Sequence, residues 1–388
     1  MRIRAVESHP IRLPRDAGTV TGRAGSPTKL AESASSYRWS QVFPCLYSTD
    51  FETAVVRVET DAGIIGWGEA QAPLAPEVAC TIVDRLLAPV LTGEEFDPTP
   101  EGIAAWWDRM YSAMRVRGQT GGFMLDAISA VDIALWDIAG KAAGVPVCRL
   151  LSAAPKLRIP AYYSGLPAAG RVDAARRAID SGFTRFKLFY DTPDAESFFR
   201  AMDELPAAQY AVDALWRHRP DSARAFGREL DARNALWFEA PLDPEDPIAH
   251  GELAHAVRTP IAIGESYRTR FEMAPFFREG AVEVYQPDLG RCGITEGMRL
   301  ATEASSRGVP VVPHLSIAFG PQIAAALHFA AAAPGCDLAE FNASVLETAN
   351  RFLREPIRME NAAYVVPRGP GLGLGELTLP AGLRSRAD

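Results

Sequence analysis

The feature that most constrains the fold is an alternation of short apolar runs with helical segments between residues 121 and 342. Eight runs occur, each about the length of one buried strand: IPAYY, RFKLFY, QYAVDA, LWFEA, PIAIGE, VEVYQPD, VPVVPH and DLAEF. Strands buried on both faces need no polar alternation, and intervening helices favour parallel pairing. The pattern predicts an α/β fold with a closed (β/α) barrel of the TIM type. An open doubly wound sheet is the alternative, but no G-x-G-x-x-G motif follows any run, which weakens its dinucleotide-binding form.

The residues before 121 predict a smaller α+β unit. Residues 2–13 alternate in polarity, and residues 53–68 contain two apolar runs joined at Asp61-Ala62-Gly63, which indicates a hairpin. Residues 76–91 and 101–115 have helical patterning, and residues 123–144 predict an amphipathic helix. The 388 residues are about two and a half times the length of a ~150-residue domain, so we expect one large and one small domain.

Composition excludes several classes of protein. The net charge of -8 provides no basic surface for nucleic acid or an anionic membrane. Five scattered cysteines without a C-x-x-C pair fit neither a disulfide framework nor a cysteine zinc site. The first residues lack a signal-peptide core, and the longest apolar stretch, residues 323–333, is far shorter than the ~20 residues of a spanning helix. We therefore expect a soluble, cytoplasmic protein.

Seven of the runs carry an ionisable residue at the carboxyl end, at nearly constant spacing. The residues are Lys187, Asp213, Glu239, Glu265, Asp288, His314 and Glu340, separated by 26 positions except for 23 between the fourth and fifth. A single acid at a strand end is usually a helix cap or a surface residue, but seven in register are not explained that way. In a barrel these ends meet at the mouth where active sites are built.

The residue types at this mouth suggest metal and acid–base chemistry. Asp213, Glu239 and Glu265 offer hard oxygen ligands without a flanking cysteine or histidine, and their crowding is costly unless a cation neutralises it. Mg²⁺ suits such a set and leaves coordination positions open for water or a substrate carboxylate. We expect one Mg²⁺ per subunit. Asp288 beside His314 would fix the imidazole tautomer and raise its basicity, as a general base requires.

The remaining candidates would contact the substrate. Lys187 is placed to hold a substrate anion, and Glu340 to donate a hydrogen bond to a developing enolate. Tyr163, after the first barrel run, is a further candidate for substrate binding. Trp67 and Glu69, in the motif GWGE, are assigned to the hairpin region and to no chemistry.

The chain resembles the enolase superfamily, in its mandelate racemase/muconate lactonizing enzyme branch. The resemblance rests on DIALWDIAGKAAGVPVCRLL, then VDA, FEAP, GES, QPDLGRCG and VPH in order, and the C-terminal GPGLGLGE. It implies Asp213, Glu239 and Glu265 as metal ligands, His314 as base with Asp288 as partner, and Glu340 as the acid on the enolate. It also implies a barrel over 123–354 and a capping domain from 1–122 and 355–388, with the polar segment 25–40 as a closing loop, in a homo-oligomer.

Three departures from the branch bear on the reaction. Relatives commonly have two lysines in a K-x-K pattern on the second strand, but Phe189 stands at the second position and cannot transfer a proton. Leu215 replaces a common Asn, and Ala240 replaces a common second Glu. Phe189 therefore disfavours a reaction that needs two opposed bases. Leu215 and Ala240 make one side of the metal site less polar.

These observations lead to a Mg²⁺-dependent lyase as the first hypothesis. It would abstract the proton α to the carboxylate of an acid sugar and dehydrate the sugar through an enediolate intermediate. A cycloisomerase or lactonizing enzyme acting on a sugar-acid lactone or anhydro sugar acid is the second hypothesis, and a racemase or epimerase the third. A non-catalytic sugar-acid-binding relative is the alternative from another class.

Overall fold

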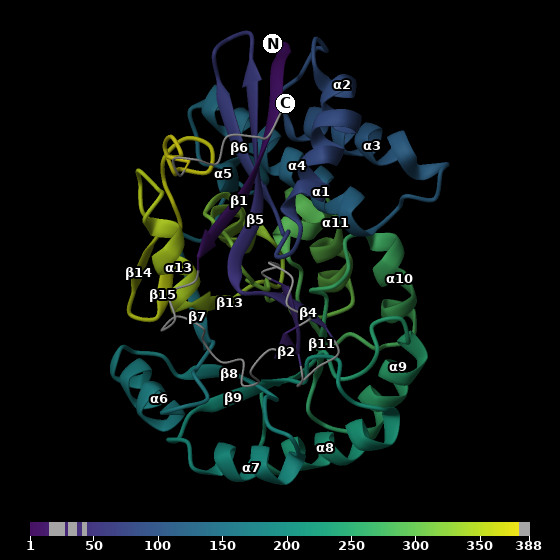
Figure 1. Cartoon of the computed structure of the whole chain (residues 1–388), viewed down its shortest axis with the longest axis vertical. Coiled ribbons are helices and arrows are strands. Elements are labelled where there is room, and N and C mark those ends of the chain that lie inside the picture. The colour runs from purple at the N-terminus through teal and green to yellow at the C-terminus, as the bar shows by residue number, and fades with distance from the viewer. Residues whose placement is uncertain (15–27, 30–36, 41–44, 380–388) are drawn as a thin grey trace.

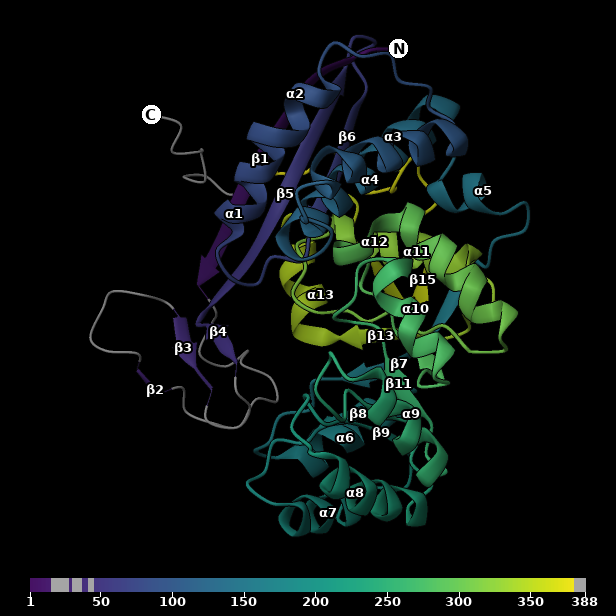
Figure 2. The same ribbon diagram turned by 90° about the vertical axis from the view of Figure 1, so that its right-hand side faces the viewer.

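The computed structural model describes residues 1–14, 28–29, 37–40 and 45–379. The expected closing loop at 25–40 therefore lies mostly outside the described residues. Only β2 (Thr28–Lys29) and β3 (Tyr37–Trp39) fall within it, and β3 also pairs with β4 (Leu46–Ser48) in a small antiparallel sheet. In Figure 2 these strands project beyond the ends of the long N-terminal strands.

Residues 158–342 form the expected closed parallel barrel. Six strands pair in order: β7 (Arg158–Ser164), β8 (Arg185–Phe189), β9 (Gln209–Asp213), β10 (Phe238–Glu239), β11 (Ile261–Ile263) and β12 (Val284–Tyr285). The last strand, β13 (Ala339–Asn342), pairs in parallel with β7. Single parallel bridges from Val311 to Tyr285 and from His314 to Asp288 fill the position between β12 and β13. The barrel predicted from the alternating runs is therefore confirmed.

The seventh run, VPVVPH, forms these two bridges instead of a continuous strand. Pro310 and Pro313 have no backbone N–H to donate to a ladder. Their carbonyls still accept hydrogen bonds from Tyr285 and Glu340, so the wall stays closed at this point.

Helices surround the barrel on the outside, and Figure 1 shows α6, α7, α8 and α9 in its lower part. They are α5 (Val147–Leu151), α6 (Arg171–Asp180), α7 (Ala195–Asp203), α8 (Pro220–Ala232), α9 (Pro247–Ala256), α10 (Arg270–Arg278), α11 (Leu289–Ser306), α12 (Pro321–Ala332) and α13 (Ala343–Asn350). A small separate group of buried side chains packs together across the strands: Tyr162, Ala211, Trp237, Ala262, Val284 and Val312. None of the helices in the described ranges is both long enough and apolar enough to cross a membrane.

The N-terminal unit is an antiparallel sheet covered by helices, above the barrel in Figure 1. Its strands are β1 (Ile3–Pro14), β5 (Asp50–Thr60) and β6 (Ile65–Ala70), and β5 and β6 form the predicted hairpin. The helical segments are α1 (Pro76–Ile82), the π-helical turn η1 (Val83–Leu87), α2 (Ala88–Leu91) and α3 (Pro100–Arg115). The predicted α+β character of this region is therefore observed.

Helix α4 (Gly122–Ala143) joins the two units, and the expectation of an amphipathic helix was wrong. Every residue from 124 to 140 is buried, because α4 contacts β6 of the N-terminal sheet and α11 of the barrel. The contact with β6 requires glycine, since a Cβ at Gly68 would lie 1.8 Å from the carbonyl oxygen of Ala130. The close packing of α4 therefore explains why the motif GWGE has glycine at position 68.

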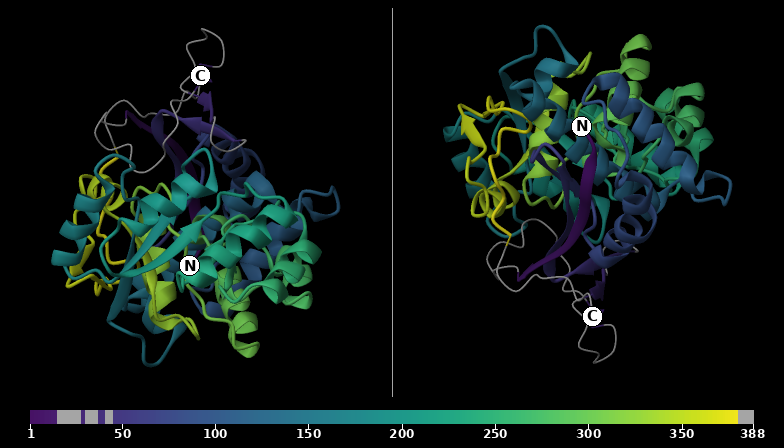
Figure 3. Two further views of the ribbon diagram at one scale, coloured as in Figure 1. Left: turned by 90° about the horizontal axis from the view of Figure 1, so that it is seen from below. Right: turned by 90° about the horizontal axis from the view of Figure 1, so that it is seen from above.

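The C-terminal residues add to the barrel before they reach α4. The unexpected strands β14 (Arg358–Glu360) and β15 (Ala363–Val365) form a hairpin, and β15 pairs antiparallel with β7. Figure 3 shows this yellow segment along one side of the molecule in both views. The backbone N–H of Leu372 then donates to Asp137 Oδ1 of α4 at 2.8 Å. The predicted domain boundaries near 122 and 354 stay a prediction.

His328 of α12 provides a test of this packing. It is fully buried, and Nδ1 accepts from the Cys148 N–H at 3.4 Å while Nε2–H donates to the Leu372 carbonyl at 3.2 Å. Burial lowers the pKa of His328 from 6.5 to about 4, although the Leu372 carbonyl acts in the opposite direction. The unfolded chain therefore binds more protons between these values, so stability is lost as pH falls from 6.5 towards 4.

We expect this histidine to contribute up to about 3 kcal/mol to the loss of unfolding free energy on acidification. Urea denaturation at several pH values between 7 and 4 should show a shallower pH dependence in His328→Gln than in the wild type. His255→Gln, at an exposed position, is the matched control. An unchanged dependence in His328→Gln would contradict the neutral, buried histidine.

Candidate active site

All seven residues of the predicted register lie at or near the carboxyl ends of the barrel strands. Five are almost completely buried: Lys187, Asp213, Glu239, Asp288 and Glu340. Glu265 and His314 are partly exposed. The structure therefore brings the candidates together in one cluster, in which Glu265 and His314 have the greatest access to solvent.

The ammonium of Lys187 lies among three carboxylates. Its Nζ is 2.6 Å from Glu239 Oε1, 2.9 Å from Glu340 Oε1 and 3.9 Å from Asp213 Oδ2. Burial alone would lower the pKa of Lys187, but the charges of Glu239 and Glu340 outweigh it and hold the pKa well above its ordinary value. Lys187 is therefore charged and neutralises part of the acidic cluster.

The carboxylates are crowded beyond what this one ammonium offsets. Burial and the neighbouring charges of Glu239 and Glu265 raise the pKa of Asp213 well above its ordinary value, despite the attraction of Lys187. Glu239, Glu265 and His314 have donor atoms that all lie within 4.8 Å of one another, which is the spacing of a metal site. Two of the three predicted metal ligands belong to this set, whereas Asp213 does not.

His314 is held between two carboxylates. Its Nδ1 is 2.9 Å from Asp288 Oδ2, and its Nε2 is 2.8 Å from Glu265 Oε2. Burial alone would lower the pKa of His314, but Glu265, Glu340 and Asp288 hold it well above its ordinary value. The same contact acts on Glu265. Burial alone would raise the pKa of that carboxyl, but the charge and hydrogen bond of His314, together with the charges of Lys187 and Arg291, lower it.

Glu340 also contacts groups on two sides. Its Oε1 lies by Lys187, and its Oε2 accepts the Leu315 N–H at 3.0 Å. Burial would raise the pKa of Glu340, but Lys187 and His314 lower it below its ordinary value. In this arrangement Glu340 is ionised and accepts hydrogen bonds, so the predicted donation to an enolate requires that it first take up a proton.

Three side chains that hold the carboxylates were not predicted. Glu239 Oε2 accepts from Trp237 Nε1 at 2.9 Å and from Gln286 Nε2 at 2.7 Å. Trp216 Nε1 donates to Glu265 Oε1 at 3.3 Å. Trp237 and Gln286 stand two positions before predicted site residues, and residues two apart point to the same face of a strand. That rule, applied to each run, would have identified both.

The departures noted in the sequence coincide with unusual backbone conformations. Leu215 and Trp216 have φ of 57° and Ala240 has φ of 45°, in the left-handed region that side chains with a Cβ rarely adopt. The Leu215 N–H donates to Asp213 Oδ1 at 2.9 Å. Such strain is retained where the surroundings over-determine it, often at functional sites. Here it lies within three residues after each of two candidate ligands, Asp213 and Glu239.

Tyr163 does not join the cluster. It packs against Phe183 and Phe341, with ring centroids 5.2 and 5.4 Å away. Alternation along β7 places Tyr162 and Ser164 on the opposite face, and Ser164 pairs with Lys187 in the sheet. The structure therefore gives Tyr163 an aromatic packing role and places Ser164 beside the site.

Phe189 lies on the inner face of β8 beside the lysine. Lys187 Nζ is 5.6 Å from the centroid of the Phe189 ring. The position at which the resemblance expects a second lysine is thus taken by an aromatic ring next to the ammonium.

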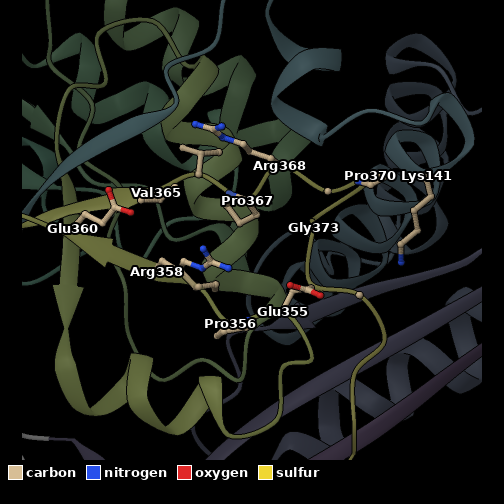
Figure 4. A pocket seen from close by; sticks show the side chains of 14 residues that line it. Lys141, Glu355, Pro356, Arg358, Glu360, Val365, Pro367, Arg368, Pro370 and Gly373 are labelled. Atoms are coloured by element: carbon tan, nitrogen blue, oxygen red, sulfur yellow. The ribbon is translucent and has the colours of Figure 1, made fainter.

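A surface groove lies elsewhere, around the C-terminal segment. Lys141 and residues between 355 and 375 line it, with Glu355, Arg358 and Arg368 among them (Figure 4). None of the seven clustered residues contributes to this groove.

Two family profiles match this chain. The one described as "Enolase C-terminal domain-like" matches residues 170–375, and "Mandelate racemase / muconate lactonizing enzyme, N-terminal domain" matches residues 47–152. The chain belongs to the enolase superfamily, in its mandelate racemase/muconate lactonizing enzyme branch. The resemblance seen in the sequence is therefore confirmed.

Named relatives in the enolase superfamily catalyse more than one reaction. The D-galactarolactone cycloisomerase of Agrobacterium fabrum is 32% identical over 82% of this chain and 88% of its own length. The arabinonate dehydratase of Saccharolobus solfataricus is 30% identical over 83% and 87%. The structure of L-talarate dehydratase from Polaromonas sp. JS666, complexed with Mg and L-glucarate, is 26% identical, with a TM-score of 0.78 over 98% and 96% of the two chains.

The position of Lys187 leads to a stability prediction. Lys187→Met removes the ammonium from three buried carboxylates, and breaking a buried ion pair from one side typically costs about 3–5 kcal/mol. Chemical denaturation should show a loss of this size. Lys156→Met, at a more exposed salt bridge with Asp337, should lose far less. Equal losses in the two variants would contradict the role of Lys187 in neutralising the cluster.

Proposed function

We propose that this protein is a Mg²⁺-dependent lyase that dehydrates a sugar acid after removing the proton α to its carboxylate. The observation that carries the proposal is the position of His314, held by Asp288 and directed at the acidic metal site. Sugar-acid dehydratases among the relatives support the same reaction class.

The acidic cluster fits a divalent cation that prefers oxygen ligands. Asp213, Glu239 and Glu265 would hold it, since burial and the charges of the two glutamates raise the pKa of Asp213 despite the attraction of Lys187. A bound Mg²⁺ would neutralise this charge, orient the substrate carboxylate and acidify the α-hydrogen. A structure of the related L-talarate dehydratase contains Mg with L-glucarate, which supports the choice of metal.

His314 is the proposed base. Asp288 accepts the hydrogen of Nδ1, so Nε2 is the nitrogen directed at the substrate. In the arrangement described above, Nε2 lies 2.8 Å from Glu265 Oε2 and the pKa of His314 is raised. His314 therefore acts as the base only after it has lost a proton, which a cation held by Glu265 would favour. The electron pair of the broken C–H bond passes into the substrate carboxylate and gives an enediolate. Lys187 stabilises this charge with its ammonium, and Glu340 keeps Lys187 in position.

The same histidine can complete the elimination. As the enediolate reverts to a carboxylate, the β-hydroxyl leaves, takes the proton from His314 and departs as water. The resulting enol then rearranges to a 2-keto-3-deoxy acid. This sequence needs no second base, in agreement with the phenylalanine ring at position 189.

A cycloisomerase acting on a sugar-acid lactone or anhydro sugar acid is the second candidate. It also needs an enediolate, but the leaving oxygen stays in the molecule. The cycloisomerase relative, 32% identical over most of the chain, favours keeping this candidate. Racemisation is third, because it commonly uses opposed bases and Phe189 cannot serve as one. We also propose a homo-oligomer, as the resemblance implies.

The decisive experiment is a screen of mono- and diacid sugars and their lactones with Mg²⁺, with mass spectrometry of the products. We expect a product lighter by one water, formed only with a divalent cation and abolished by a chelator. Glu265→Gln should lower turnover strongly, whereas Glu360→Gln, at an exposed ion pair with Arg158, should not.

Other outcomes of the screen would contradict the proposal. An isomeric product of unchanged mass would favour the cycloisomerase or an epimerase. Thermal stabilisation by sugar acids without any turnover, in protein with measured Mg²⁺ binding, would indicate a binding protein.

A further inference from the structure

Glu69, in the motif GWGE, has no role in the proposed reaction, yet it is completely buried between the two units. It lies on β6 and points at the start of α12. Its Oε1 accepts from the Thr53 hydroxyl and the Phe319 N–H, and its Oε2 accepts from the N–H groups of Gly320 and Gln322, each at 3.0 Å. Four donors therefore saturate this carboxylate, which belongs to the N-terminal sheet.

This carboxylate caps a barrel helix from another part of the chain. Helix α12 begins after Gly320, and no capping side chain of its own accepts from its first turn. A helix start presents unpaired N–H groups and a positive dipole end, which favour a negative charge. Glu69 thus holds residues 319–322, five to eight positions after His314.

The same helical turn carries an amide to the His–Asp pair. Gln322 is 1% exposed, and its Nε2 donates to Asp288 Oδ1 at 2.9 Å. The Gly290 N–H donates to the same oxygen at 2.9 Å. With Oδ1 engaged twice, Oδ2 faces His314 Nδ1. A Cβ at Gly290 would lie 2.4 Å from Gln322 Oε1, so the glycine makes room for this amide.

We propose that Glu69 and Gln322 are positioning residues for the base. The structure connects them in one series: Glu69 fixes the first turn of α12, that turn directs Gln322, Gln322 orients Asp288, and Asp288 orients His314. The N-terminal sheet thereby sets the orientation of a side chain in the barrel mouth. This inference rests on the proposed function, in which His314 is the base.

The kinetic test uses Gln322→Met and Glu69→Gln, with the sugar acid that the wild type converts fastest in the screen described above. Methionine keeps the length of Gln322 but cannot donate, so Asp288 loses one constraint while the helix remains. We expect kcat to fall about 10- to 100-fold, as for other residues that orient reacting groups, and KM to change much less. Gln209→Met, at the opposite end of a barrel strand, is the matched control.

A second measurement does not depend on turnover. Amide hydrogen exchange over residues 315–322 should accelerate in Glu69→Gln, because the capping carboxylate is lost, and should change little in Gln322→Met. The double variant should be no slower than the more impaired single variant, since both residues act through the same series.

Specific results would overturn the inference. Unchanged kcat in Gln322→Met would do so, as would multiplicative effects in the double variant or a fall in kcat that only follows lost thermal stability. If His314→Asn keeps full activity, the proposed function fails. If His314→Asn is inactive while Gln322→Met is normal, only the positioning role fails.

Discussion

Crowding of buried carboxylates around a single ammonium is the constraint on which the site depends. Asp213, Glu239 and Glu340 all approach Lys187, while Glu265 and Asp288 flank His314. Charges of one sign are costly to gather away from water unless they are paired or neutralised. Lys187 offsets only part of this cost, and the pKa of Asp213 remains raised. The cluster is therefore suited to binding a further cation.

The rest of the architecture keeps these charges in place. Strand ends supply the carboxylates, while Trp237 and Gln286 fix Glu239 and Trp216 contacts Glu265. The backbone after Asp213 and after Glu239 adopts left-handed conformations. From outside the barrel, Glu69 reaches the helix that follows His314. The catalytic geometry we propose is therefore a property of both units together, joined by the buried helix α4.

Much of this arrangement could be predicted because strand ends in a barrel converge. The nearly constant spacing along the sequence was sufficient to locate Lys187, the carboxylates and His314. The spacing between strands could not place Tyr163, because alternate residues of β7 point to opposite faces. Tyr163 lies on the face that points away from the site. Gln322 and Glu69 could not be found from spacing, since they reach the site through a helix cap formed between positions 253 residues apart. The amphipathic expectation for α4 failed because both of its faces are covered.

The central claim is that His314 removes the proton α to a substrate carboxylate. Proton NMR in D₂O, with Mg²⁺ and a sugar acid that the protein binds, measures this step directly through the loss of the α-hydrogen signal. The account predicts loss of that signal with the wild type and a rate lower by about 10²–10⁴-fold with His314→Asn. An equal rate of exchange in the variant, or no exchange in an active wild type whose products retain the α-hydrogen, would contradict it.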